Sequence, residues 1–122
     1  MEYKTLPNSE LELMMILWEK DEPMTRMEIE DRLPKKRHLS KTTILSFLSR
    51  LEEKGFVQVE KVGRNNCYLP IVKKEDYLRQ EGSSILQKLF GNSVKKLVAS
   101  LYDGDNLTKD QIEELKDYLD NL

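Results

Sequence analysis

Hydroxyl-bearing and cationic side chains gather between residues 40 and 50, and their types suit one chemical task better than any other in the chain. The members of this set are Ser40, Lys41, Thr42, Thr43, Ser46, Ser49 and Arg50. Hydroxyl groups and cations donate hydrogen bonds to the phosphates and base edges of nucleic acids. From Arg32 to Leu51 there is no Asp or Glu to oppose them. The pattern favours contact with a polyanion.

Catalysis is not indicated by the same residues. Thr42 and Ser46 have no neighbouring base that would activate them, and His38 is the single histidine. Cys67 is the single cysteine, so neither an internal disulfide nor a structural zinc site can form. We interpret Cys67 as a small strand residue, with a thiol sensor as the alternative. The sequence predicts no enzyme, no cofactor and no metal ligand.

The charge distribution along the chain is uneven. The net charge is −6 over residues 1–31, +8 over residues 32–74 and −4 over residues 75–122, although the whole chain carries only −2. A basic segment between acidic segments is typical of a nucleic-acid contact. The alternative is a charged surface that simply faces water.

The 122 residues, 39% apolar and 34% charged, suffice for one domain with an appended helical segment. No apolar run approaches the roughly 20 residues that span a bilayer. The N-terminus also lacks the basic start and apolar block of a signal peptide. We therefore expect a cytoplasmic protein that does not insert into membranes.

Apolar periodicity and capping signals predict three helices in the first half. The first covers 9–20, with a capping box of Ser9 and Glu12 and an apolar stripe of Leu11, Met14, Met15 and Trp18. The second starts at a capping box of Thr25 and Glu28 and ends near Leu33. The third runs from an N-cap at Ser40 to about Lys54, with Ile44, Leu48 and Leu51 as its buried stripe and Gly55 in the left-handed conformation after it.

Beyond Gly55 the apolar period falls from 3.6 to about 2, which predicts two strands over 56–62 and 67–72. A turn over 63–66 joins them, and Pro70 limits the second strand to a sheet edge or to an early end. From Glu75 the chain is helical again, with a break at Gly91-Asn92 and a last helix capped by Thr108 and Gln111.

Three helices followed by a hairpin are typical of a winged helix-turn-helix, in which the third helix contacts DNA and the hairpin is the wing. The predicted fold is therefore mainly α with a small β-hairpin. We expect a winged helix DNA-binding domain over 1–74 and a helical dimerisation domain over 75–122.

The predicted DNA-binding residues lie on the third helix and the wing, and they are Ser40, Lys41, Thr42, Thr43, Leu45, Ser46, Arg50, Lys61, Arg64 and Asn65. Lys41, Thr42, Leu45 and Ser46 are candidates for base contacts, and the others for phosphate or minor-groove contacts. Leu45 suits a thymine methyl group, or instead packs under a neighbouring helix. Arg50 contacts phosphate or the minor groove, or instead forms an intrahelical pair with Glu53 or an adjacent acidic residue.

The apolar stripes of the C-terminal helices predict a dimer interface, because so small an appendage cannot bury them alone. The expected interface residues are Leu86, Leu89, Phe90, Val94, Leu97, Val98 and Leu101. The alternative is that these side chains pack only within their own chain.

With these residues in view, nearly the whole chain resembles the penicillinase-repressor (BlaI/MecI/CopY) family of bacterial transcription repressors. The similar segments are LELMMILWEKDEPMTRMEIEDRL, TTILSFLSRLEEKGFV, VGRNNCYLPIVKKEDY and DQIEELKDYL. The resemblance implies a homodimer that binds a dyad-symmetric DNA operator and controls β-lactam-resistance or related genes.

Two regulatory features of the family do not match this chain. Its β-lactam branch is cleaved at an Asn-Phe bond in response to a membrane sensor, whereas the similar position here is Ser100-Leu101. Its copper branch ends in a cysteine-rich tail, which the C-terminal DYLDNL lacks. The upstream sensor or protease therefore stays unknown. A rival interpretation is a winged helix that mediates protein contacts within a larger assembly.

Overall fold

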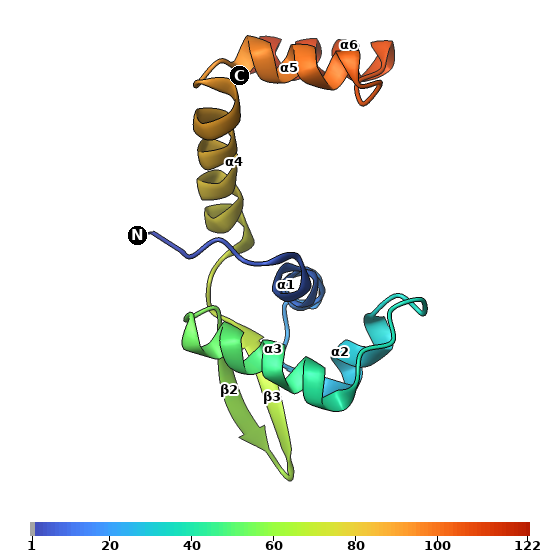
Figure 1. Cartoon of the computed structure of the whole chain (residues 1–122), viewed down its shortest axis with the longest axis vertical. Helices are drawn as coiled ribbons and strands as arrows, with labels where there is room; N and C mark the ends of the chain where they lie inside the picture. The colour runs from blue at the N-terminus through green and yellow to red at the C-terminus, as the bar shows by residue number, and fades with distance from the viewer. Residues whose placement is uncertain (1) are drawn as a thin grey trace. The chain divides into compact units, whose positions relative to one another are not determined.

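Six helices and a small antiparallel sheet make up the computed structural model, which describes residues 2–122 (Figure 1). The order is α1 (Asn8–Lys20), β1 (Met24–Thr25), α2 (Arg26–Arg32), α3 (Lys41–Glu53), β2 (Val57–Val62), β3 (Asn65–Pro70), α4 (Lys74–Phe90), α5 (Val94–Asp103) and α6 (Lys109–Asp120). The predicted fold class, mainly α with a small β-hairpin, is confirmed.

The chain divides into two compact units, Met1–Gln80 and Glu81–Leu122, which we call the winged unit and the C-terminal unit. The winged unit extends six residues beyond the predicted domain boundary at 74. Tyr77 accounts for part of this extension, because its ring is buried in the core of the winged unit. Gln80 accounts for the rest, because its side chain bonds to the backbone of Tyr3.

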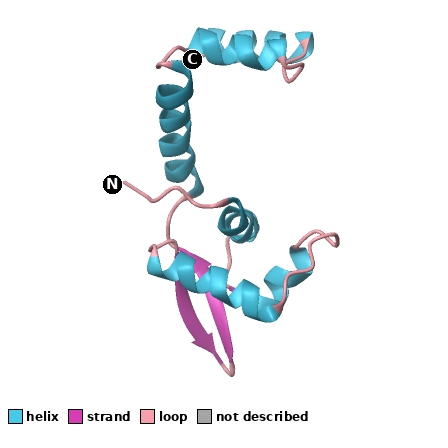
Figure 2. Cartoon of the chain, in the orientation of Figure 1, coloured by secondary structure: helices cyan, strands magenta, loops and turns pink. Residues whose placement is uncertain are grey.

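The sheet has the strand order β1-β3-β2, so β3 lies in the middle. Figure 2 shows the two long strands of the hairpin, β2 and β3, in magenta. The prediction missed β1, in which Met24 pairs with Tyr68 and Thr25 with Cys67. Of the two alternatives predicted for Pro70, the edge strand is wrong, because β3 is the central strand. The early end is confirmed, because Pro70 is the last residue of β3. It lies beyond the reach of the two-residue β1, so the missing N–H of proline disrupts no β1–β3 pair.

The turn of the hairpin is tighter than predicted. Val62 already pairs with Asn65, so only Gly63 and Arg64 form the loop. Gly63 has φ 64°, a left-handed conformation that glycine adopts without steric cost and that suits a two-residue hairpin. Arg64 therefore lies at the tip of the wing.

The core of the winged unit joins α1, α2 and α3 to the sheet. Ile44, Leu48 and Leu51 are fully buried, which confirms the stripe predicted for the third helix. The stripe predicted for the first helix is partly confirmed, because Met14 is fully buried and Leu11 and Trp18 pack against the core. Met15 was wrong, since it is 41% exposed, and α1 buries Leu13 and Leu17 instead.

The apolar pattern did not reveal the buried side of α1, because a charged residue lies on that side. Glu10 lies on it and is only 2% exposed, since its carboxylate pairs with Lys54 at the end of α3. A buried charge of this kind requires such a partner. The predicted capping box of Ser9 and Glu12 is also wrong, because α1 starts after Pro7 with no side-chain cap.

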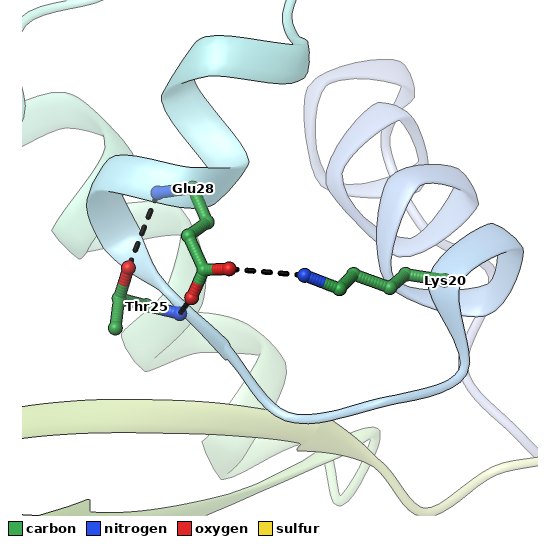
Figure 3. Close-up of polar contacts among 3 residues, drawn as sticks. All are labelled: Lys20, Thr25 and Glu28. Carbon is green, nitrogen blue, oxygen red and sulfur yellow. Dashed lines mark hydrogen bonds and ion pairs between the residues drawn. The ribbon is translucent and has the colours of Figure 1, made fainter.

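The second predicted capping box is confirmed. Thr25 Oγ1 accepts from the N–H of Glu28, and a Glu28 carboxylate oxygen accepts from the N–H of Thr25 (Figure 3). Lys20, from the end of α1, donates to the other oxygen of Glu28 at 3.0 Å. The Thr25 N–H, and then Lys20, lower the pKa of Glu28 from 4.5 to about 2. The start of α2 is thus tied to α1.

The C-terminal unit has well-defined helices but no buried side chain among residues 81–122. Gly91 and Asn92 both have positive φ, which ends α4 at the predicted break. The predicted capping box of Thr108 and Gln111 starts α6. None of the helices described over residues 2–122 is both long and apolar enough to cross a membrane.

Candidate nucleic-acid interface

The outer surface of α3 follows directly from its sequence. The buried stripe of Ile44, Leu48 and Leu51 turns one side of the helix toward the core. The opposite side exposes Thr42 and Ser46 to solvent. A recognition helix needs this arrangement, because its outer side chains must enter a DNA groove.

The N-terminus of α3 is held by Ser40, as predicted. Its side chain accepts from the N–H of Thr43 at 3.1 Å, and the hydroxyl oxygens of Ser40 and Thr43 lie 2.8 Å apart. Each hydroxyl therefore already has a partner within the helix. Any phosphate contact at this end would add to the cap and would not replace it.

A pocket of about 270 Å³ lies where α2, α3 and the wing meet. From the predicted set it brings together Lys41 and Leu45 of α3 with Arg64 and Asn65 of the wing. Its other lining residues are not among the predicted contacts, and these are Thr25, Arg26, Met27, Asn66 and Tyr68. No acidic side chain lines the pocket.

The contribution of α2 to this pocket could not be inferred locally. The only sequence signal at Thr25 was the capping box that it forms with Glu28. Pairing of Thr25 with Cys67 places this turn beside the wing, and the two residues are far apart in the sequence. The pocket therefore depends on the strand that the sequence analysis missed.

Leu45 and Arg50 each had two interpretations, and the structure bears on both. Leu45 is 36% exposed and lines the pocket, and it is absent from the side chains that pack against the core. Arg50 forms no ion pair with Glu53. Its guanidinium carbon instead lies 5.9 Å from the centre of the Phe47 ring, a distance typical of a cation–π contact.

The remaining predicted residues lie outside the pocket. Thr42, Ser46 and Arg50 are exposed on α3, and Lys61 is exposed on β2 opposite Asn66. Thr43 is half-buried and Ser40 is exposed at the helix start. These side chains extend the polar surface beyond the pocket along both elements.

Intramolecular ion pairs separate the cations of the basic segment into two groups. Arg37 pairs with Glu12 at 3.4 Å, and Lys54 pairs with Glu10. Within the described residues, Lys41, Lys61 and Arg64 have no carboxylate partner. Five further cations of the segment also lack one among the described residues, and these are Arg32, Lys35, Lys36, Lys73 and Lys74. The cations without internal partners therefore include those of α3 and the wing but are not confined to them.

Tyr68 is one of the residues that line the pocket, and it is only 6% exposed. Its burial, and then the negative charge of Glu52, raise the pKa of Tyr68 above its usual value of 10. No group of three or more metal-ligating side chains occurs among residues 2–122.

Comparison with known proteins places this geometry in a family. The family model for the penicillinase repressor matches residues 6–121. The penicillinase repressor of Bacillus licheniformis is 29% identical over 115 residues, which are 94% of this chain and 89% of that protein. The methicillin resistance regulatory protein MecI of Mammaliicoccus sciuri is 28% identical over 93% of this chain and 92% of its own length.

A solved structure supports the same assignment for the winged unit. The solution structure of the DNA-binding domain of the repressor BlaI is 31% identical and superposes with a TM-score of 0.53. It covers 62% of this chain and 94% of that domain. The resemblance identified from the sequence is thus confirmed, and the chain belongs to the penicillinase repressor family.

Proposed function

We propose that this repressor acts as a homodimer that binds a dyad-symmetric DNA operator through α3 and the wing. The pocket at the junction of α2, α3 and the wing carries the proposal, because Lys41 and Arg64 both line it and no acidic side chain does. Winged helices bind DNA with the corresponding helix and hairpin. The similar BlaI domain is described as DNA-binding.

The proposed contacts divide into two kinds. Thr42 and Ser46, with Lys41 and Leu45, would meet base edges from the N-terminal half of α3, which is the half that recognition helices insert. The residues that would contact phosphate or the minor groove are Ser40, Thr43, Arg50, Lys61, Arg64 and Asn65. Phosphate contacts supply affinity and base contacts supply sequence preference.

The dimer is supported by the C-terminal unit, which does not bury its own apolar residues. Leu89 is 72% exposed, Val94 61% and Leu101 38%. Leu86, Phe90, Leu97 and Val98 are only half-buried. Apolar stripes that remain this accessible in a single chain are typical of an interface with another. We infer that a second copy covers them.

Two further inferences concern the regulated genes and the cellular compartment. The relatives are named for penicillinase and methicillin resistance, so β-lactam-resistance or related genes are the proposed targets. The bacterial cytoplasm, where an operator lies, is the proposed site of action.

The experiment starts with a pool of random duplexes from which the wild-type protein selects its preferred sequence. Affinity for the selected duplex is then measured between 50 and 200 mM salt for wild type, Arg64→Ala and Thr42→Ala. Arg64→Ala is expected to weaken all duplexes alike and to reduce the salt slope by about one unit. Thr42→Ala is expected to change the preference among sequences.

Arg79→Ala serves as the control, because Arg79 is an exposed cation on α4 whose side chain pairs with Asp76 outside the proposed interface. It should leave affinity and salt slope unchanged. If micromolar wild-type protein binds no duplex at about 50 mM salt, where phosphate contacts are strong, the DNA-binding proposal fails. A winged helix that mediates protein contacts would then be the better interpretation.

A further inference from the structure

The N-terminal strap, residues 2–7, is hydrogen-bonded to the first turns of α4. The N–H of Tyr3 donates to Gln80 Oε1 at 2.7 Å, and Gln80 Nε2 donates back to the carbonyl oxygen of Tyr3. The N–H of Leu6 donates to the hydroxyl of Tyr77 at 2.9 Å. These bonds join residues more than 70 positions apart in the sequence. The strap therefore fixes the beginning of α4 to the winged unit.

The α4 side of these bonds is itself anchored in the core. Tyr77 is 2% exposed, and its ring centre lies 5.5 Å from that of Phe56 and 5.7 Å from that of Trp18. Trp18 also donates its ring N–H to the carbonyl of Val72 at 2.8 Å, just before α4 begins. The start of α4 is thus fixed by contacts of Tyr77 within the helix and of Val72 just before it.

On the strap side, Leu6 is 5% exposed and the ring of Tyr3 lies 6.0 Å from that of Phe56. Phe56 therefore contacts both the strap and Tyr77. Gln80 differs from these core residues, because it is only partly buried and both of its side-chain hydrogen bonds to Tyr3 end on the strap backbone. Its removal should loosen the strap without opening the core.

The hydrogen bonds of Gln80 lie at the boundary between the two units. Gln80 is the last residue of the winged unit, and α4 continues from it into the C-terminal unit as one helix to Phe90. A dimeric repressor recognises two half-sites at a fixed separation, so each winged unit must be held firmly by the helix that leaves it. If the first two turns of α4 frayed, they would act as a flexible tether instead.

We propose that Gln80 and Tyr77, acting through the N-terminal strap, are positioning residues that set the half-site spacing which the repressor accepts. This inference rests on the proposed dimeric, operator-binding function. It assigns no DNA contact to the strap. Its effect should appear only when both winged units of a dimer bind one duplex.

The test compares three duplexes with one protein at a time. The first is the palindrome selected by the wild-type protein, the second carries two inserted base pairs between the half-sites, and the third contains one half-site alone. The variants are Gln80→Met, which keeps the side-chain length and removes both bonds to Tyr3, and Tyr77→Phe, which keeps the ring and removes the acceptor for Leu6. Gln87→Met, on the exposed part of the same helix, is the matched control.

Gln80→Met is expected to bind the palindrome about tenfold more weakly, because a loose tether lowers the effective concentration of the second unit. Its affinity for the half-site should stay within about twofold of wild type, and it should discriminate less between the palindrome and the spaced duplex. Tyr77→Phe should change the same ratio in the same direction. Gln87→Met should behave as wild type.

The outcomes separate this inference from the function on which it rests. A wild-type protein that forms no dimer, or binds no duplex, would refute the proposed function. If wild type binds the palindrome but both variants keep its discrimination against the spaced duplex, the positioning role is refuted and the function stands. Equal weakening on the palindrome and the half-site would also refute it, since that result indicates a general loss of stability.

Discussion

The two units of this repressor use apolar residues in opposite ways. In the winged unit, side chains such as Phe56, Leu13 and Leu48 are completely buried within one chain. In the C-terminal unit, residues of the same type, such as Leu89 and Val94, are more than half exposed. Helical periodicity is present in both. Periodicity therefore predicts a buried side for a helix, but it does not tell which chain will bury it.

The largest effect is expected from truncating the core of the winged unit. Phe56→Ala removes a fully buried ring that contacts Tyr3 and Tyr77, and should cost about 3–5 kcal/mol of unfolding free energy. Urea unfolding monitored by circular dichroism measures this loss, which should be the same at every protein concentration. Leu122→Ala, at an 84% exposed terminal residue, is the control and should have no measurable effect.

A charge in the C-terminal stripe should act through association instead. Leu97→Asp is expected to give monomers on light scattering and about 100-fold weaker operator binding, because the second winged unit no longer benefits from the first. Ala99→Asp places the same charge on the opposite side of α5, where the chain is exposed, and should remain dimeric. A Leu97→Asp dimer of wild-type tightness would show that the stripe does not form the interface.

The two capping boxes offer a matched comparison between the units. Thr25→Ala and Thr108→Ala each remove the hydroxyl that accepts from the N–H three residues later, a bond worth about 1 kcal/mol, while the backbone bond of each box is kept. Thr25→Ala should lower the stability of the winged unit at any concentration. Thr108→Ala should instead raise the dimer dissociation constant, measured by analytical ultracentrifugation. If Thr108→Ala leaves that constant unchanged, α6 is equally stable in the monomer.

The smallest expected effect is a pH dependence of stability, which the capping box at Thr25 should show and the one at Thr108 should not. The pKa of Glu28 is lowered to about 2 in the folded protein from an ordinary 4.5, so its carboxylate stabilises the fold fully above pH 4.5. This contribution is lost as the pH falls from 4.5 toward 2. The difference in stability between wild type and Glu28→Gln should therefore shrink over that range in thermal unfolding. The Thr108 box contains the uncharged Gln111. Gln111→Ala should therefore lower stability by the same amount at every pH between 4.5 and 2.

A control distinguishes this pH effect from the general titration of the surface. Glu22→Gln removes an exposed carboxylate that has no ion pair among the described residues. Its stability should follow the wild-type curve between pH 2 and 7. A Glu28→Gln difference that stays constant over this range would contradict the lowered pKa.

The features that the sequence predicted well are those that depend on neighbouring residues. The caps at Thr25, Ser40 and Thr108, and the left-handed Gly55, follow from side chains within one turn of each other. The buried stripe of α3 was equally clear, because no charged residue interrupts it.

The features that were missed depend on distant partners. β1 is only two residues long and exists because it pairs with β3, more than 40 residues later. The buried side of α1 could not be identified because Glu10 lies on it, and its partner Lys54 is 44 positions away. The same limit applied to the candidate site, in which Lys41, Leu45, Arg64 and Asn65 were predicted while Thr25, Arg26 and Met27 were not.

The uninterrupted course of α4 through the boundary between the two units has a consequence for how this chain can change in length. A loop would absorb an extra residue, but in a helix each inserted residue advances the C-terminal remainder of the chain by about 1.5 Å and turns it by about 100°. The effect of an insertion or deletion near Gln80 should therefore depend on the rotation that it adds to the helix as well as on the length. The same holds for base pairs added between the two halves of a palindrome. A change of seven residues, close to two whole turns, nearly restores the rotation although not the length, and should therefore disturb operator binding less than a change of two.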